Sequence, residues 1–131
     1  MKLFLSIKFY KDASNLGLIR KIISAGKKQG HVVRCIFTDY EDDGKKSFPP
    51  KELMQLAFEE IKKCDALVVE FSEKGVGLGI EAGYAFSKGL PIFVIAKKEA
   101  DVSGTLMGIA KKVVLYDSDE DLELFFKEIS I

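Results

Sequence analysis

Several residue types are scarce in this chain of 131 residues, which has one histidine, two cysteines, three prolines and no tryptophan. The histidine, His31, follows a glycine that ends a predicted helix, so we expect a structural role and no Ser-His or Cys-His catalytic pair. Cys35 and Cys64 lack the spacing of a metal site and fall in predicted buried elements. We therefore expect core thiols, no bound metal and a reducing, cytoplasmic environment.

The chain also lacks an excess of charge of either sign, because 20 Lys and Arg residues balance 20 Asp and Glu residues. A net charge of zero gives no electrostatic argument for binding nucleic acid or an anionic membrane. The longest apolar runs have the length of a strand, far below the ~18 residues of a membrane span. The first residues, MKLFLSIKF, have no long apolar core and no small-residue cleavage site, so we interpret them as a strand and not as a signal peptide.

Strand and helix patterns alternate along the whole chain, of which 47% is hydrophobic. This length and composition predict a single domain over residues 1–131 with a substantial core. Helices are expected between short apolar runs, wherever apolar residues recur at helical spacing. The apolar runs themselves predict five strands, at Leu3–Ile7, Val32–Phe37, Ala66–Phe71, Pro91–Ala96 and Val113–Tyr116.

The helix boundaries have signals of their own. Ser14 or Asn15 is expected to cap the first helix, Pro49 and Pro50 to open the next, and Ser118 to cap the last. A short helix is expected at Thr105–Lys111. The polar stretch Thr38–Pro50 between the second strand and its following helix is either a lid or a mobile solvated turn.

Strands that alternate with helices need crossover connections, which predicts a parallel sheet covered by helices on both faces. We therefore expect an α/β fold, a flavodoxin-like (Rossmann-like) three-layer sandwich with a five-stranded parallel sheet in the order 2-1-3-4-5. Ligands of such folds bind at the carboxyl ends of strands 1 and 3, where the chain order reverses. The loops at residues 8–14 and 72–79 should therefore converge on one crevice.

A glycine-rich turn follows the third strand and opens a helix that carries Glu81. Gly75, Gly77 and Gly79 allow a ligand to approach the backbone closely, and free amides at the start of a helix favour anions. A carboxylate beside such a turn indicates chemistry on a ribose and not only the binding of a phosphate. The alternative is that Glu81 is an ordinary acid near a helix start, stabilised by the helix dipole.

The stretch CDALVVEFSEKGVGLGIEAGYAFSKGLPIFVI, residues 64–95, resembles the signature of the nucleoside 2-deoxyribosyltransferase-like superfamily. It is most similar to the branch of 2'-deoxynucleoside 5'-phosphate N-hydrolases. The resemblance implies that Glu81 is a nucleophile that attacks the anomeric carbon, expels the base and forms a glycosyl-enzyme ester. Such a role suits a carboxylate, since N-glycosidic cleavage passes through an oxocarbenium-like state that negative charge stabilises. The matching residues are Asp65, Val68, Val69, Glu70, Gly77, Gly79, Glu81 and Gly83.

The resemblance also implies a set of substrate-binding residues. Ser103 matches a serine that contacts the 5'-phosphate. A Ser-Ile-Arg-like motif after the first strand corresponds either to Ser6-Ile7-Lys8 or to Lys8-Phe9-Tyr10, depending on the register. Lys8 and Tyr10 are further candidates to hold a phosphate and a base, unless they belong to an ordinary polar loop. Together with the turn glycines, the predicted substrate-binding residues are Ser6, Lys8, Tyr10, Gly75, Gly77, Gly79 and Ser103.

Three positions differ from the hydrolase pattern. Phe4 stands where the family has a tyrosine, Ala57 where it has an aspartate, and Gly75 where it has a serine of the phosphate loop. Glu60 lies one helical turn from Ala57 and is either a substitute acid or a solvated helix charge.

These observations predict an enzyme that needs no cofactor and hydrolyses the N-glycosidic bond of (2'-deoxy)nucleoside 5'-monophosphates through a covalent glycosyl-glutamate intermediate. One alternative is a nucleoside 2-deoxyribosyltransferase, in which a second base replaces water. Another is a non-catalytic nucleotide-binding domain, which Phe4 and Ala57 favour. The resemblance further implies a homodimer, or a tetramer built from dimers, whose interface completes the sites. Apolar residues that could form this interface, or could only pack helices on the sheet, include Leu53, Met54, Phe58, Phe86 and Met107.

Overall fold

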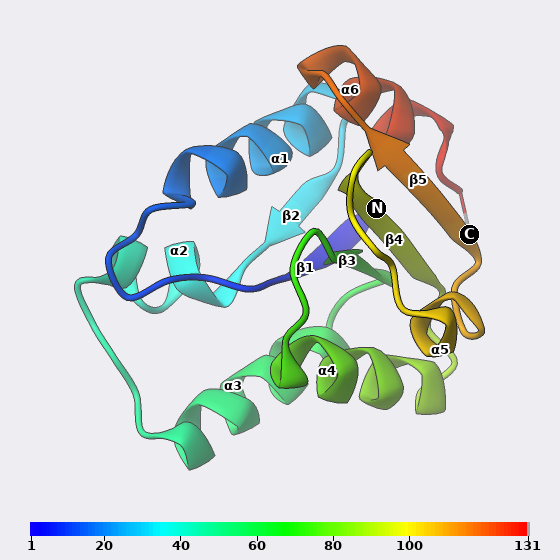
Figure 1. Ribbon diagram of the computed structural model, residues 1–131. Helices are drawn as coiled ribbons and strands as arrows, with labels where there is room; N and C mark the ends of the chain where they lie inside the picture. The colour runs from blue at the N-terminus through cyan, green and yellow to red at the C-terminus, as the bar shows by residue number, and fades with distance from the viewer. Residues whose placement is uncertain (131) are drawn as a thin grey trace.

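Five parallel strands form the centre of the structure, a computed structural model that describes residues 1–130 (Figure 1). Their order is β2-β1-β3-β4-β5, and all four neighbouring pairs run parallel, which confirms the predicted fold. Ile131, the last residue of the predicted domain, lies outside the described residues. The strands are β1 (Lys2–Ile7), β2 (Val32–Arg34), β3 (Ala66–Glu70), β4 (Ile92–Lys97) and β5 (Lys112–Tyr116).

Helices cover both faces of the sheet (Figure 1). On one face lie α1 (Leu16–Lys28) and α6 (Asp119–Glu128), and on the other lie α3 (Pro50–Lys62) and α4 (Val76–Ser87). The single-turn helix α5 (Gly104–Met107) lies beside α4. The result is the predicted three-layer sandwich.

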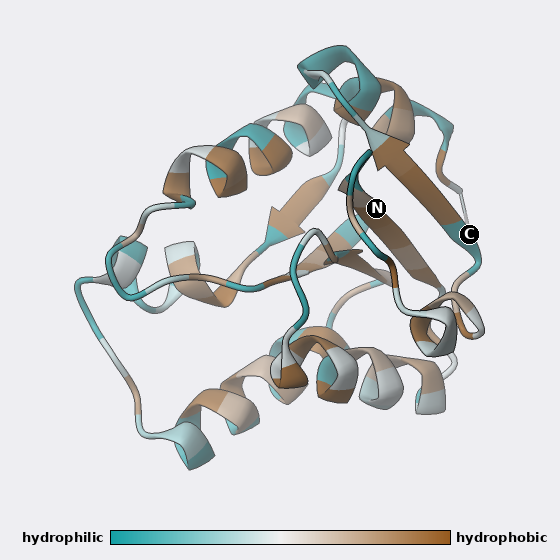
Figure 2. Cartoon of the chain, viewed as in Figure 1, coloured by the Kyte–Doolittle hydropathy of each residue, from teal (hydrophilic) through white to brown (hydrophobic). Residues whose placement is uncertain are grey.

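The core is divided by the sheet into two parts, because alternate residues of a strand point to opposite faces. In β3, Ala66 and Val68 pack toward α1 and α6, whereas Leu67 and Val69 pack toward α3 and α4. Figure 2 shows the strands as mostly apolar along their length, with polar residues on the outer sides of the helices. This pattern is typical of strands buried on both faces.

Local signals fix the ends of the helices. Pro50 is the first residue of α3, where its missing N–H costs nothing. The Ser118 hydroxyl accepts a hydrogen bond from the Asp121 N–H, and the Asp121 carboxylate accepts one from the Ser118 N–H. This capping box confirms the predicted start of the last helix, which buries Leu122 and Phe125 against the sheet.

The predicted strand Val32–Phe37 is wrong in its second half. β2 ends at Arg34, and the short helix α2 (Ile36–Asp39) follows directly. The Asp39 carboxylate accepts a hydrogen bond of 3.1 Å from the Cys35 backbone N–H, which stabilises the start of α2. The apolar residues at its beginning therefore fill the core from a helix and not from a strand.

Two other predicted segments are shorter or more regular in the structure. The polar stretch Thr38–Pro50 contains the end of α2 and a 3-10 turn at Asp42–Gly44, whose three residues have φ angles of 49°, 57° and 92°. The helix predicted at Thr105–Lys111 is only the single turn α5, because the Lys111 N–H already donates to the Ile92 carbonyl at 2.8 Å, next to β5.

His31 and the two cysteines have the expected structural roles. His31 Nε2 donates to the Phe126 carbonyl at 2.7 Å, and His31 Nδ1 lies 3.0 Å from the N-terminal nitrogen of Met1. Cys35 and Cys64 are buried and unbridged, and burial raises the pKa of each thiol to about 11. None of the described helices is long and apolar enough to cross a membrane.

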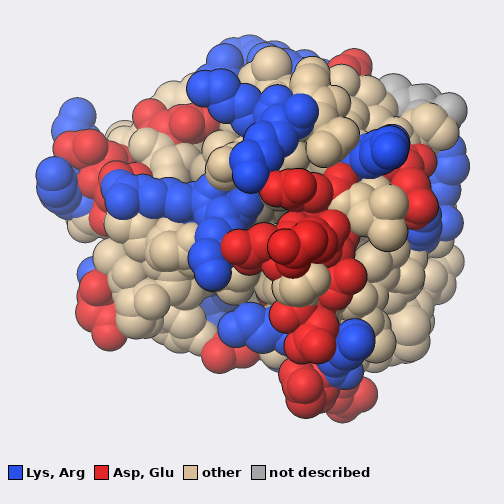
Figure 3. Space-filling view, turned by 90° about the horizontal axis from the view of Figure 1, so that it is seen from above, with Lys and Arg blue, Asp and Glu red and all other residues tan. Residues whose placement is uncertain are grey.

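The charged side chains of α1 are all basic, whereas those of α6 are acidic except for Lys127. Figure 3 shows this face from above, with basic and acidic side chains next to one another. Two ion pairs join the helices: Lys28 Nζ lies 2.8 Å from Glu123 Oε1, and Lys21 Nζ lies 3.7 Å from Asp119 Oδ1. The basic side chains of α1 thus face acidic side chains of α6 across this layer.

Candidate active site

Glu81 lies in the second turn of α4 and reaches back to the sheet. The Ser6 hydroxyl, near the carboxyl end of β1, donates a hydrogen bond of 2.5 Å to Glu81 Oε1. Ser6 itself is only 1% exposed, so its side chain has little freedom to turn away. The carboxylate is therefore held in a fixed direction at the predicted switch point of the sheet.

A cavity of about 300 Å³ opens beside this carboxylate, with walls from the end of β1 and from α2, α3 and α4. We call it the Glu81 cavity. Lys8 and Glu81 are its only charged lining residues within the described chain, and Gly75 and Gly77 form part of its rim. The remaining lining residues are apolar: Ile7, Phe9, Ile36, Leu53, Met54, Ala57, Val76 and Leu78.

Burial changes the acidity of Glu81. Desolvation raises the pKa of Glu81 to about 7, while the hydrogen bond from Ser6 acts in the opposite direction because it favours the charged form. Both protonation states are therefore populated near neutral pH. A carboxylate poised in this way can act as a nucleophile or as a proton acceptor.

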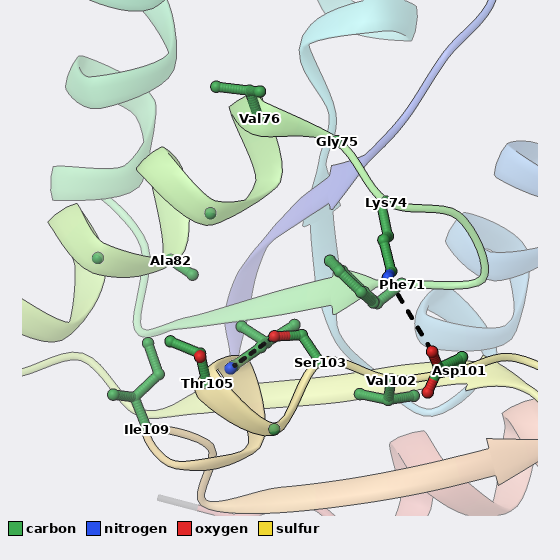
Figure 4. Close-up of a pocket in the computed structure, with 14 residues that line it drawn as sticks. Phe71, Lys74, Gly75, Val76, Ala82, Asp101, Val102, Ser103, Thr105 and Ile109 are labelled. Atoms are coloured by element: carbon green, nitrogen blue, oxygen red, sulfur yellow. Dashed lines mark hydrogen bonds and ion pairs between the residues drawn. The ribbon is translucent and has the colours of Figure 1, made fainter.

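A second and larger cavity, of about 830 Å³, lies on the other side of α4 (Figure 4). We call it the α5 cavity, because Ser103 and the residues of α5 form one of its walls. The Ser103 hydroxyl accepts a hydrogen bond of 3.4 Å from the Leu106 N–H and so caps α5. Gly79 also faces this cavity, whereas Gly75 lines both cavities. Within one chain, Ser103 thus lies across α4 from the Glu81 cavity, and Gly79 is on the side of α4 that faces Ser103.

Lys8 and Tyr10 lie beyond the end of β1 and adopt different positions. Lys8 lines the Glu81 cavity, and its Nζ lies 3.8 Å from Glu73 Oε2 and 5.6 Å from the centre of the Tyr10 ring. Tyr10 lines a small cavity of about 70 Å³ together with Glu70, and Lys8 lines this cavity as well. Of the predicted binding residues, Ser6, Lys8, Gly75 and Gly77 are therefore near Glu81, and Tyr10 is not among the residues that line its cavity.

Phe4 and Ala57, which differ from the hydrolase pattern, and the possible substitute acid Glu60 have different environments in the structure. Phe4 is buried in the core, and Ala57 lines the Glu81 cavity without a polar group. The Glu60 carboxylate accepts a hydrogen bond from the Tyr40 hydroxyl and lies 3.8 Å from Lys63 Nζ. Glu60 does not line the cavity, so its interactions are those of a structural pair and not of a substitute acid.

Sequence reasoning matched Glu70, at the end of β3, to the family signature but did not predict the buried contacts that this carboxylate makes. It is 3% exposed and accepts hydrogen bonds from the Ser72 N–H at 2.7 Å, from the Ser72 hydroxyl at 2.6 Å and from the Tyr116 hydroxyl. Burial and this last bond raise the pKa of Tyr116. Glu70 faces the α1 side of the sheet, opposite to Glu81, and joins β3 to β5. Its place in the apolar run ALVVEF is the signal that it needs buried partners.

No protein-family model matches the chain. A protein of Thermofilum pendens with the provisional name 2'-deoxynucleoside 5'-phosphate N-hydrolase 1 is 29% identical over 130 residues, which cover 94% of this chain and 91% of that protein. The predicted resemblance to the nucleoside 2-deoxyribosyltransferase-like superfamily is confirmed.

Solved structures agree with this superfamily at the level of the fold. The CMP N-glycosidase of Clostridium botulinum has a TM-score of 0.69 and 18% identity, with 95% of this chain and 97% of that chain covered. The 2-deoxyribosyltransferase of Bacillus psychrosaccharolyticus has a TM-score of 0.74 and 14% identity, with 94% and 90% covered. A conserved protein of Enterococcus faecalis V583 has a TM-score of 0.72 and 18% identity, with 98% of each chain covered.

Proposed function

We propose that this protein is an N-glycosidase that hydrolyses the bond between base and sugar in nucleoside 5'-monophosphates. The observation that carries the proposal is the Glu81 carboxylate, fixed by Ser6 in a ligand-sized cavity at the switch point of the sheet. The names of the Thermofilum pendens relative and of the two solved enzymes support an enzyme that cleaves or exchanges N-glycosidic bonds.

The proposed reaction has two steps. A Glu81 oxygen attacks the anomeric carbon C1' of the sugar, and the electron pair of the C1'–N bond leaves with the base. Water then attacks C1', the C1'–O bond to Glu81 breaks, and its electron pair returns to the carboxylate, while the proton that the water loses is taken up by the departed base. The Ser6 hydroxyl orients the carboxylate in the first step and stabilises its negative charge when the second step restores it.

The 5'-phosphate is proposed to bind at the mouth of the Glu81 cavity. Lys8 supplies a positive charge there, and α4 begins directly after Gly75, so its first N–H groups near Gly77 are available to an anion. Nucleosides should then bind more weakly than their monophosphates by ~1–3 kcal/mol, the scale of charge-assisted hydrogen bonds. Equal affinities in calorimetry would remove the phosphate subsite and favour the transferase alternative.

We also propose a homodimer, which would act in the cytoplasm. Ser103 is separated from Glu81 by α4 within one chain, so a second copy packed along α4 is the arrangement that would bring a Ser103 to a Glu81 cavity. A chain that sediments as a monomer of 14.6 kDa at micromolar concentration would overturn the dimer. Support comes from large apolar side chains that α4 and α5 expose, at 45–82% of their area: Val76, Ile80, Phe86 and Met107.

Product analysis separates the proposed reaction from its two alternatives. The protein is incubated with a panel of ribo- and deoxyribonucleoside monophosphates, with and without a second free base. Release of free base alone identifies a hydrolase, exchange of the base identifies a deoxyribosyltransferase, and neither product identifies a binding domain. Glu81→Gln should abolish turnover with binding retained, whereas Glu120→Gln, an exposed exchange on α6, should leave turnover unchanged. Wild-type turnover by Glu81→Gln would contradict the mechanism.

A further inference from the structure

Within a single chain, the Glu81 cavity has a nucleophile but lacks a group suited to protonate a departing base. A neutral base that leaves with the electron pair of the C1'–N bond becomes an anion, so it needs a proton donor near it. Among residues 1–130, the only carboxyl group that lines this cavity is Glu81, and no histidine, tyrosine or cysteine lines it. The same carboxyl group cannot attack as an anion and also give a proton in that step.

Other acidic groups nearby are engaged elsewhere. Glu60 accepts from the Tyr40 hydroxyl and lies near Lys63, and Glu70 faces the opposite side of the sheet. Lys8, the remaining ionisable residue of the cavity, is beside Glu73 at 3.8 Å, and an ammonium group gives up a proton less readily than a carboxyl group.

The walls of the cavity are suited to a flat ring with positive charge. Phe9 presents an aromatic side chain and Met54 a polarisable thioether, and the other wall residues are aliphatic. A cation inside this apolar space would have Glu81 as its counter-charge. It would also favour the ionised, nucleophilic form of Glu81, which burial alone disfavours.

We propose that the preferred substrates are mononucleotides whose base carries a positive charge, such as N-ribosylpyridinium and N7-alkylpurinium nucleotides. This inference rests on the proposed N-glycosidase function. When the C1'–N bond breaks, its electron pair neutralises the ring nitrogen, so the base leaves as a neutral molecule without a proton. Water resolves the Glu81 ester and releases one proton to solvent. The products are the sugar 5-phosphate, the neutral base and that proton, and no further reactant is needed.

The experiment compares nicotinamide mononucleotide, a pyridinium, with its reduced dihydropyridine form, which has nearly the same shape but no ring charge. CMP and AMP serve as ordinary neutral-base substrates, and chromatography measures the released base. Because a positioned general acid contributes about 100-fold or more, we expect kcat/KM for the pyridinium to exceed that for the neutral substrates by about 100-fold. Glu81→Gln should abolish the release of nicotinamide.

A second experiment introduces a carboxylic acid into the Glu81 cavity. Ala57→Asp places a carboxyl group on the cavity wall, and Met54→Glu does so at a position that is less buried and better suited to a charge. Either variant should raise turnover of CMP or AMP relative to nicotinamide mononucleotide by at least about tenfold. Neutral-base nucleotides cleaved as fast as the pyridinium by the wild-type protein would overturn this inference and leave the proposed function intact. Release of no base from any substrate would overturn both.

Discussion

Replacement of Glu81 by glutamine tests the electrostatics of the candidate site without reference to a substrate. Burial raises the pKa of Glu81 to about 7 from its ordinary value of 4.5. The folded protein therefore holds this proton more tightly than the unfolded chain does. The resulting stability is fully present below about pH 4.5 and is lost as the pH rises through about 7. Glutamine keeps the shape and the acceptor for Ser6 but cannot ionise.

The size of the effect follows from the same values. The difference 7 − 4.5 is 2.5 pKa units, and 1.36 kcal/mol per unit gives about 3 kcal/mol. The free energy of unfolding of Glu81→Gln minus that of the wild type should therefore increase by about 3 kcal/mol between pH 4 and pH 8.5. Urea denaturation of both proteins across this range measures the difference, in which most other titrating groups cancel.

A matched exchange on the surface supplies the control. Glu120→Gln, at the exposed start of α6, should give a difference that varies little over the same pH range. A difference for Glu81→Gln that stays constant with pH, or that decreases, would refute a raised pKa of Glu81 in the folded protein.

Two further predictions concern single contacts. Ser6→Ala removes a hydrogen bond that favours the charged form of Glu81, so the pKa of Glu81 should rise by about 1–2. NMR of the Glu81 carboxyl carbon measures this pKa, and a value at or below that of the wild type would contradict the prediction. Gly26→Ala in α1 places a Cβ 2.5 Å from Val33 Cγ2 and should lower the free energy of unfolding, measured by thermal denaturation, by about 1–3 kcal/mol. The control Gly17→Ala, in the same helix, places a Cβ with nothing within 4 Å and should leave stability unchanged or increase it.

The sequence predicts the sheet well because parallel strands buried on both faces read as continuous apolar runs. Four of the five predicted strands agree with the structure to within one residue at each end. The exception, Val32–Phe37, belongs to an edge strand of three residues that pairs with β1 alone. The apolar run continues past Arg34 because Ile36 and Phe37 are buried in the core as part of the helix α2. Composition alone does not distinguish apolar residues of a buried strand from those of a short buried helix.

The candidate site is less accessible to sequence reasoning. The glycine-rich turn and Glu81 can be placed near the ends of strands 1 and 3 from the order of elements alone. The contact between Ser6 and Glu81 depends on which face of β1 the serine occupies and on the rotation of α4. The position of Ser103 depends on the path of the chain after β4, which leads to the opposite side of α4. These are properties of packing between distant segments, and local pattern does not encode them.

The position of β1 in the sheet has a consequence for synthesis of the chain. One edge of β1 pairs with β2 once about 35 residues exist, but its other edge pairs with β3, from Leu3 with Ala66 to Ile7 with Glu70. Until residue 70 of 131 has left the ribosome, an apolar strand keeps one hydrogen-bonding edge open. Open apolar edges can pair with other chains, and partners this distant in sequence close slowly. Nascent chains should therefore be most prone to aggregate while the first half of the protein is complete and β3 is still absent.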